Sequence, residues 1–372
     1  MVLLGNGMDG PRLRHHRARR EDHDHGRPSV AEMTTVGLDL AKSWFQVHGA
    51  DAQGRPVLRK KLARGKVLEF FAGLPACLVG MESCGSAHHW ARELIKLGHE
   101  VRLIPPQYVR PYVKGNKHDA ADAEAICEAV TRPTMRFVPV KTIEQQSLCQ
   151  LHRIRQLLVK QKTMHVNALR GHLAELGIVR GQGQGKVSEL LRLIEDASDD
   201  ALSAKIRGQL RHLVELLRDL HRRLAEIDRE LGELAREHPA ARRLATIPGV
   251  GPVTATALAA AIGDVGRFRS GRHLAAYLGL VPKQHSSGGK ERLGAISRRG
   301  DTYLRTLLMH GARTVVKIMK ARPSSADDWI GRLLRRRPVN VAVVAQANRT
   351  ARIAWAVLAK AEDYRRPATA AV

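Results

Sequence analysis

The chain has 372 residues and carries 62 Lys and Arg against 36 Asp and Glu, so its formal net charge is +26. Hydrophobic residues make up 44% and charged residues 26%, which is typical of a folded chain and excludes wholesale disorder. No run approaches the ~18 apolar residues of a membrane span, and the N-terminus lacks the apolar segment of a secretory signal. The four cysteines have no C-x-x-C spacing, which indicates neither a zinc site nor a disulfide framework. We therefore expect a cytoplasmic protein of two or three domains.

The positive charge is unevenly distributed and indicates a polyanionic partner. Residues 1–32 have a net charge of +1 and lack hydrophobic periodicity, so they are predicted to be a disordered extension. The net charge is +5 over residues 33–140, +3 over 141–238 and +17 over 239–372. Because this excess is larger than a solvated surface needs, nucleic acid rather than a membrane surface is the predicted partner.

Residues 33–140 are predicted to form an α/β domain. Three strands follow one another directly, at 34–40, 44–50 and 57–62. Further strands at 76–82 and 100–104 alternate with helices at 67–72, 87–97 and 119–130. Consecutive strands followed by alternation describe a mixed sheet covered by helices.

Residues 141–238 are predicted to form long helices. One helix covers 143–176, and a second, after a glycine-rich loop, carries apolar residues at alternating steps of four and three. These residues are Ile206, Leu210, Leu213, Leu217, Leu220, Leu224, Ile227, Leu231 and Leu234. Such a repeat predicts a coiled coil. An antiparallel hairpin with the 143–176 helix and self-association between chains fit the pattern equally well.

Residues 239–372 are predicted to form a basic, mostly helical domain. The segment 244–264 has the form helix, glycine-rich hairpin, helix, and further helices are expected at 301–320 and 341–358. Backbone amides around Gly249 and Gly251, at the start of a helix, can bind a phosphate without reading base sequence. The alternative is a plain Gly-Pro turn between two ordinary helices.

Four acidic residues are candidates for a metal site. Asp39 ends the first predicted strand and Glu82 the fourth, at the carboxyl edge where sheets form ligand crevices. Asp119 and Asp122 share one face at the start of a helix. Two Mg²⁺ or Mn²⁺ ions ~3.5–4 Å apart would neutralise four converging carboxylates and activate a nucleophile for attack on a phosphate. Taken singly, Asp119 has an ordinary explanation as a helix cap and Asp39 as a turn former.

The segment G-L-V-P-K-Q-H-S-S-G-G-K-E-R-L-G-A-I-S-R-R-G-D, residues 279–301, combines adjacent serines, glycines and cations. The cations predicted to contact phosphate, in this segment and just after it, are Lys283, Lys290, Arg292, Arg298, Arg299 and Arg305. A loop that cradles phosphate is the minimal interpretation. A nucleophile at Ser287 is the stronger one, but its oxygen needs a base or a metal, and the spacing of His285 proves nothing. On chemistry alone, a flexible turn is favoured.

Together these motifs resemble the DEDD-type insertion-sequence transposases, also called bridge-RNA-guided recombinases. The resemblance covers about residues 35–358 and rests on G-L-D-L-A-K, M-E-S-C-G, N-K-H-D-A-A-D-A, I-P-G-V-G and G-L-V-P-K-Q-H-S-S-G-G-K, in the family's order. It implies a RuvC-like (RNase H-like) domain, a coiled-coil connection and a C-terminal transposase domain. Its nucleophile falls on Ser287, with Ser286 second. Its metal ligands fall on Asp39, Glu82, Asp119 and Asp122. Residues 1–32 depart from the family pattern.

The resemblance also implies partners. It implies a homo-oligomer, a dimer or tetramer, in which the acidic site of one subunit serves the serine domain of another. A structured RNA from the element would pair with donor and target DNA and so choose the sites. The leading hypothesis is a Mg²⁺-dependent recombinase that inserts and excises its own element. The alternatives are a RuvC-type resolvase or nuclease that uses water, and a non-enzymatic architectural DNA-binding protein.

Overall fold

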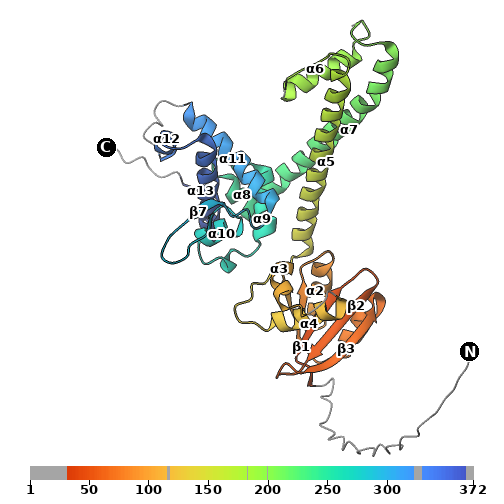
Figure 1. The fold of residues 1–372 in the computed structure, drawn as a ribbon, viewed down its shortest axis with the longest axis vertical. Coiled ribbons are helices and arrows are strands. Elements are labelled where there is room, and N and C mark those ends of the chain that lie inside the picture. Colours follow the sequence, from red (N-terminus) through yellow and green to blue (C-terminus); the bar gives the residue numbers. More distant parts are fainter. Residues whose placement is uncertain (1–31, 115–117, 182, 199, 322–328, 366–372) are drawn as a thin grey trace, which may run out of the picture. The chain divides into compact units, whose positions relative to one another are not determined.

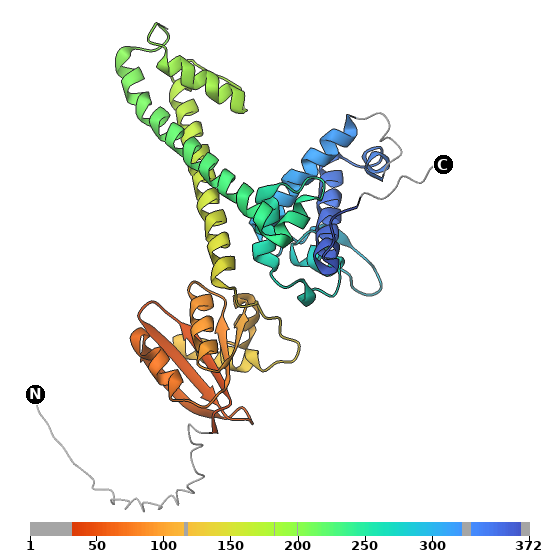
Figure 2. The same cartoon turned by 180° about the vertical axis from the view of Figure 1, so that it is seen from behind.

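The computed structural model describes residues 32–114, 118–181, 183–198, 200–321 and 329–365. The chain divides into two compact units, residues 1–140 and 141–372 (Figures 1 and 2). The first unit is α/β and the second is mostly helical, as the sequence predicts. The predicted extension lies outside the described residues except for Glu32. Within the described ranges, every helix is too short or too polar to cross a membrane.

A mixed sheet forms the centre of the first unit. Its strands are β1 (Thr35–Leu40), β2 (Trp44–Ala50), β3 (Pro56–Ala63), β4 (Leu78–Glu82) and β5 (Glu100–Ile104). The order is β3-β2-β1-β4-β5, with β1, β2 and β3 paired antiparallel and β1, β4 and β5 paired parallel. This confirms the predicted mixed sheet and is consistent with an RNase H-like fold.

Helices cover both faces of this sheet. The core on one face joins alternate residues of β1 and β4, such as Leu38 and Met81, to α1 (Val67–Ala72) and α2 (Ala87–Lys96). The opposite face packs against α4 (Asp119–Val130). The short helix α3 (Pro106–Val109) leads from β5 towards α4.

Long helices begin the second unit. They are α5 (Ile143–Ala174), α6 (Gln184–Glu195) and α7 (Ala204–Glu237). Helix α7 packs antiparallel against α5 of the same chain (Figure 1), since Arg155 in the N-terminal half of α5 pairs with Asp228 in the C-terminal half of α7. The antiparallel hairpin that the sequence allowed is therefore formed by α5 and α7 of one chain. The coiled-coil supercoil and self-association stay predictions.

The rest of the second unit is a helical bundle around one apolar core. Its helices are α8 (Pro239–Ala245), α9 (Pro252–Ile262), α10 (Gly271–Tyr277), α11 (Thr302–Lys320), α12 (Trp329–Leu334) and α13 (Val339–Lys360). The helices predicted at 301–320 and 341–358 are confirmed by α11 and α13. The sequence did not predict the two-stranded sheet of β6 (Pro282–Gln284) and β7 (Leu293–Ile296), which lies in the serine segment.

Candidate catalytic sites

Two glycines allow α4 to lie directly against the sheet. Gly37 of β1 and Gly80 of β4 are partners in the parallel pairing. A Cβ at Gly37 would overlap the carbonyl oxygen of Ala123 and lie 2.5 Å from the amide nitrogen of Cys127. A Cβ at Gly80 would lie 2.8 Å from the Cβ of Val130. The glycine pair therefore sets how closely the helix approaches the strands.

This packing brings three of the four predicted carboxylates together. Asp39 and Glu82 lie two residues after the glycines and so point to the same face of the sheet, towards α4. The carboxylates of Asp39, Asp119 and Asp122 each have an oxygen within 4.8 Å of the other two. Glu82 follows on the adjacent strand, but among the described residues it is outside that group. We call the three-residue group the acidic cluster.

The start of α4 leaves the acidic cluster available to a cation. The helix cap is His118, whose Nδ1 accepts the amide of Ala121 at 3.1 Å, so the explanation of Asp119 as a cap is wrong. Within the described ranges, Asp119 and Asp122 form no ion pair. The positive end of the helix dipole lowers the cost of two charges in the first turn but does not cancel three. An all-carboxylate donor set of this size fits a hard divalent cation.

Cys84 follows Glu82 by two residues, and the sequence reasoning did not single it out. Desolvation of its thiol raises the pKa of Cys84 above its ordinary value, and the negative charges of Glu82 and Asp39 raise it further. Glu82 and Asp39 thus both raise the pKa of the Cys84 thiol. The signal in the sequence was the position of Cys84, two residues beyond the end of β4.

The serine segment forms a β-hairpin with a tight turn, which we call the serine hairpin (residues 282–296). The amide of Lys290 donates to the carbonyl of Ser287 at 3.1 Å across the two-residue turn. Gly288 and Gly289 have φ angles of +56° and +74°, which matches a type I′ turn that suits the twist of paired strands. The segment predicted as a loop is therefore a hydrogen-bonded hairpin, and Ser287 is the residue before its turn.

The two serines differ in their contacts. The Oγ of Ser286 accepts a hydrogen bond from Nε2 of Gln284 at 3.1 Å. The side chain of Ser287 is exposed and makes no hydrogen bond with any described residue. Ser287 therefore has the more accessible hydroxyl of the pair.

Five of the six cations predicted to contact phosphate are exposed, and one is buried. The exposed ones are Lys283, Lys290, Arg292, Arg298 and Arg299. Arg305 is only 9% exposed, and its guanidinium donates to the carbonyls of Leu278 at 3.2 Å and Arg299 at 3.0 Å. In this structure Arg305 thus joins the end of α10 to the segment after the serine hairpin, which differs from the phosphate contact predicted for it.

The two glycines of the I-P-G-V-G turn have different surroundings. Gly249 has a φ angle of +83°, and a Cβ there would lie 2.8 Å from the carbonyl oxygen of Gly311 in α11. Close packing of two backbones therefore accounts for Gly249. Gly251 is the exposed N-cap of α9, with open space around it. Phosphate binding at this turn stays a prediction.

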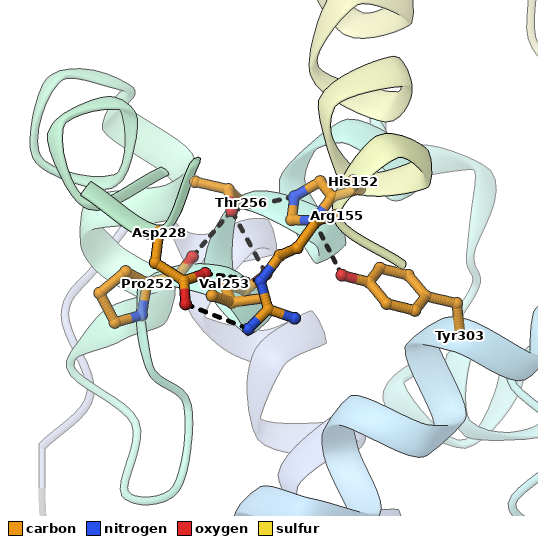
Figure 3. Close-up of polar contacts among 7 residues, drawn as sticks. All are labelled: His152, Arg155, Asp228, Pro252, Val253, Thr256 and Tyr303. Carbon is orange, nitrogen blue, oxygen red and sulfur yellow. Dashed lines mark hydrogen bonds and ion pairs between the residues drawn. The ribbon is translucent and has the colours of Figure 1, made fainter. Parts of the chain in front are cut away.

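A buried polar network joins α5, α9 and α11 in the second unit (Figure 3). The hydroxyl of Thr256 donates to the carbonyl of Pro252 at 2.8 Å, so it accepts from Nε2 of His152 at 3.1 Å. Nδ1 of His152 is then left to accept the hydroxyl of Tyr303 at 3.1 Å. Burial and, to a smaller extent, the charge of Arg155 together lower the pKa of His152 to about 4. The network therefore requires a neutral imidazole.

Comparison with known proteins places these features among DNA transposases and recombinases. Residues 241–327 match the sequence profile described as "Transposase IS116/IS110/IS902 family", and residues 36–178 match a DEDD-type IS110 profile described as "Transposase". The chain is 50% identical over 334 residues to the "Probable family 20 transposase" of Pseudomonas aeruginosa, covering 90% of this chain and 99% of that protein. It is 40% identical over 339 residues to the "Transposase for insertion sequence element IS1111A" of Coxiella burnetii, covering 91% and 93%.

The chain belongs to the IS116/IS110/IS902 family of transposases. A more distant relative is the "Pilin gene-inverting protein" of Moraxella bovis, 27% identical over 229 residues that cover 59% of this chain and 60% of that one. Membership in this family implies a DNA transposase that binds the element's ends and its target. The DEDD-type domain implies the use of a divalent metal, which agrees with the acidic cluster.

Proposed function

We propose that the chain cleaves and rejoins the DNA of an insertion sequence with Ser287 as nucleophile and Mg²⁺ at the acidic cluster. The observation that carries the metal part is the convergence of three carboxylates within 4.8 Å, two of them without an ion pair among the described residues. A divalent cation bound there would neutralise the carboxylates and lower the pKa of an oxygen that it contacts. Glu82, on the adjacent strand end, is proposed as the fourth ligand.

The proposed role of the serine hairpin is to bring an accessible hydroxyl to a phosphodiester. Oγ of Ser287 loses its proton and bonds to phosphorus, the bond from phosphorus to one deoxyribose oxygen breaks, and that oxygen takes up a proton. Attack by the hydroxyl of another strand reverses these steps and frees the serine. The exposed Lys283, Lys290 and Arg292 are proposed to hold the phosphates nearby.

We further propose that site choice comes from a structured RNA of the element that pairs with both DNAs, and that the protein acts as a dimer or tetramer. The support for RNA guiding is the resemblance of the motifs together with a charge of +17 after residue 238, which suits backbone contacts. Sequencing of copurifying RNA, with the element's flanks co-expressed, tests this. Finding no bound RNA would count against guiding.

The decisive experiment for the serine is a search for a protein–DNA adduct that survives SDS. Wild-type protein with Mg²⁺ and the element's end DNA should give the adduct, and Ser287→Ala should abolish it together with strand transfer. Ser286→Ala is the matched control and should keep both, because its hydroxyl is already engaged by Gln284. Unimpaired strand transfer by Ser287→Ala would favour the resolvase. No cleavage of cognate DNA by purified protein with Mg²⁺, together with unchanged DNA binding by Asp39→Ala, would favour the architectural protein.

A further inference from the structure

A groove opens beside the serine hairpin in the second unit. Its volume is about 1110 Å³, and its walls come from α10, α12, α13 and the base of the hairpin. Trp329 and Trp355 form part of the helical walls, while Pro282 and Ile296 belong to β6 and β7. This volume exceeds the ~300–1,000 Å³ of ordinary small-molecule pockets, so the groove has room for a planar ring that is part of a longer molecule.

The groove combines aromatic faces with cations. Arg272, Arg349 and Arg352 line it, and no Asp or Glu stands among the described lining residues. These arginines form no ion pair within the described ranges. The guanidinium of Arg349 lies 5.2 Å from the ring centroid of Trp329, whose side chain is 38% exposed. Such a surface suits a ligand that is both aromatic and anionic.

Two hydrogen bonds orient the side chains of Trp355 and Asn348 in the groove wall. The indole nitrogen of Trp355 donates to the carbonyl of Phe268 at 2.9 Å, so the polar edge of that ring is already used. The side-chain amide of Asn348 donates to the carbonyl of Leu280 at 3.0 Å and keeps its own oxygen and one hydrogen for another partner. The groove thus offers stacking surface, phosphate-binding cations and one group able to contact a base edge.

We propose that this groove holds an unpaired nucleotide of the DNA strand that the serine hairpin engages, with the base stacked on Trp329. This inference rests on the proposed function, because the hairpin forms part of the same wall. Bases in a duplex are stacked on their neighbours and cannot enter, so occupancy selects DNA that is locally unpaired near the cleaved bond. Arg349 and Arg352, one turn apart on α13, contact the flanking phosphates.

The test measures binding without chemistry. The full chain, with no divalent cation, is titrated with a labelled duplex that carries a single-stranded thymidine tail and with the same duplex blunt-ended. The tail should tighten binding about tenfold, the amount that stacking of a base on an aromatic ring contributes. Trp329→Ala should abolish this preference, Arg349→Gln should reduce it, and Trp329→Phe should retain most of it.

The matched control is Trp44→Ala in the first unit. Trp44 is 50% exposed and has the ammonium of Lys61 5.2 Å from its ring centroid, so it copies the chemistry of Trp329 but is not among the residues that line the groove. Its removal should leave the tail preference unchanged. Thermal melts and sedimentation of each variant show whether folding or subunit number has changed.

Three results would overturn the inference. The first is that both Trp329→Ala and Arg349→Gln keep the preference for the tailed duplex. The second is that an RNA tail is preferred over the thymidine tail and that this preference depends on Trp329. The third is that Trp329→Ala changes the oligomeric state. Its failure is separable from failure of the proposed function. Ser287→Ala that keeps strand transfer would remove the serine mechanism whatever the tail preference, and loss of the preference alone would leave the serine mechanism intact.

Discussion

The acidic cluster and the serine hairpin are held in place in opposite ways. The carboxylates lie at strand and helix ends that are fixed by the close packing of α4 on Gly37 and Gly80. Ser287 lies between two short strands whose side chains are nearly all exposed, directly before a glycine turn. Metal sites need ligand geometry fixed before the metal arrives, whereas a nucleophile presented to DNA has to reach its phosphate. The contrast indicates that packing governs the first site and backbone conformation governs the second.

The largest expected effect comes from breaking the packing under the acidic cluster. In Gly37→Ala the new methyl group would overlap the carbonyl oxygen of Ala123, so α4 has to move away from the sheet. We expect a loss of about 3 kcal/mol in the free energy of unfolding of the first unit, at the upper end of overpacking costs. Divalent-metal affinity should fall with it. Urea denaturation followed by the fluorescence of buried Trp90, and calorimetric metal titration, measure the two effects.

Gly65→Ala is the control for this change. Gly65 has no heavy atom within 4 Å of an added Cβ and no positive φ angle, so it should unfold at the wild-type urea concentration. Equal stability and metal affinity for Gly37→Ala and Gly65→Ala would show that the glycine pair does not position α4.

An intermediate effect is expected from acid in the second unit. Burial lowers the pKa of His152 from 6.5 to about 4, so the folded state binds this proton less readily than the unfolded state. Its contribution to stability is complete above pH 6.5 and is lost as the pH falls towards 4. We expect a loss of about 2–3 kcal/mol over that range, because protonation places a charge at a buried site close to Arg155.

Thermal unfolding at a series of pH values measures this loss. His152→Gln should be less stable near neutral pH and should show a correspondingly smaller decline between pH 6.5 and 4. His212→Gln, at an exposed position on α7, should decline like the wild type. Parallel pH profiles for His152→Gln and the wild type would show that the imidazole carries no such linkage. This pH-dependent loss of stability concerns the second unit, which carries the serine hairpin, since every member of the network lies in that unit.

The sequence predicted the acidic cluster better than the serine hairpin, for a physical reason. Strand alternation and the i, i+3 spacing are local patterns, and they suffice to place Asp39, Asp119 and Asp122 on facing elements. The exact distance depended on Gly37 and Gly80 meeting α4, a long-range contact without a local pattern. The local motif identifies which residues form the acidic cluster, and the packing of α4 on the sheet sets the distances between them.

The serine hairpin and the residues around it lacked local sequence patterns of this kind. Strands β6 and β7 have three and four residues, nearly all exposed, so no apolar alternation marks them. Arg305 looked like its neighbours because cations are normally exposed. Its burial depends on two carbonyls, that of Leu278, which is remote in sequence, and that of Arg299, which lies in an irregular segment. The aromatic groove was missed because Trp329 and Trp355 come from different helices.

The smallest expected effect tests backbone control of the serine hairpin. At Gly288, with φ +56°, an alanine side chain costs about 1 kcal/mol because L-residues avoid this region. Nothing lies within 4 Å of a Cβ at this position, so Gly288→Ala isolates conformation from packing. We expect the Lys290 amide, which closes the turn, to exchange with solvent about fivefold faster. Strand transfer should slow by a similar factor, since the hydroxyl of Ser287 then spends less time in its turn-defined position.

Gly294→Ala in β7 separates the turn from the hairpin as a whole. Gly294 has a negative φ angle and only ordinary contacts, 3.8 Å and beyond, around an added Cβ. It should keep wild-type exchange at Lys290 and wild-type strand transfer. If Gly288→Ala and Gly294→Ala behave alike, the left-handed turn is not what presents Ser287. If only Gly288→Ala slows transfer while the urea midpoint of the first unit stays constant, the left-handed conformation of the turn governs the position of Ser287 as packing governs the acidic cluster.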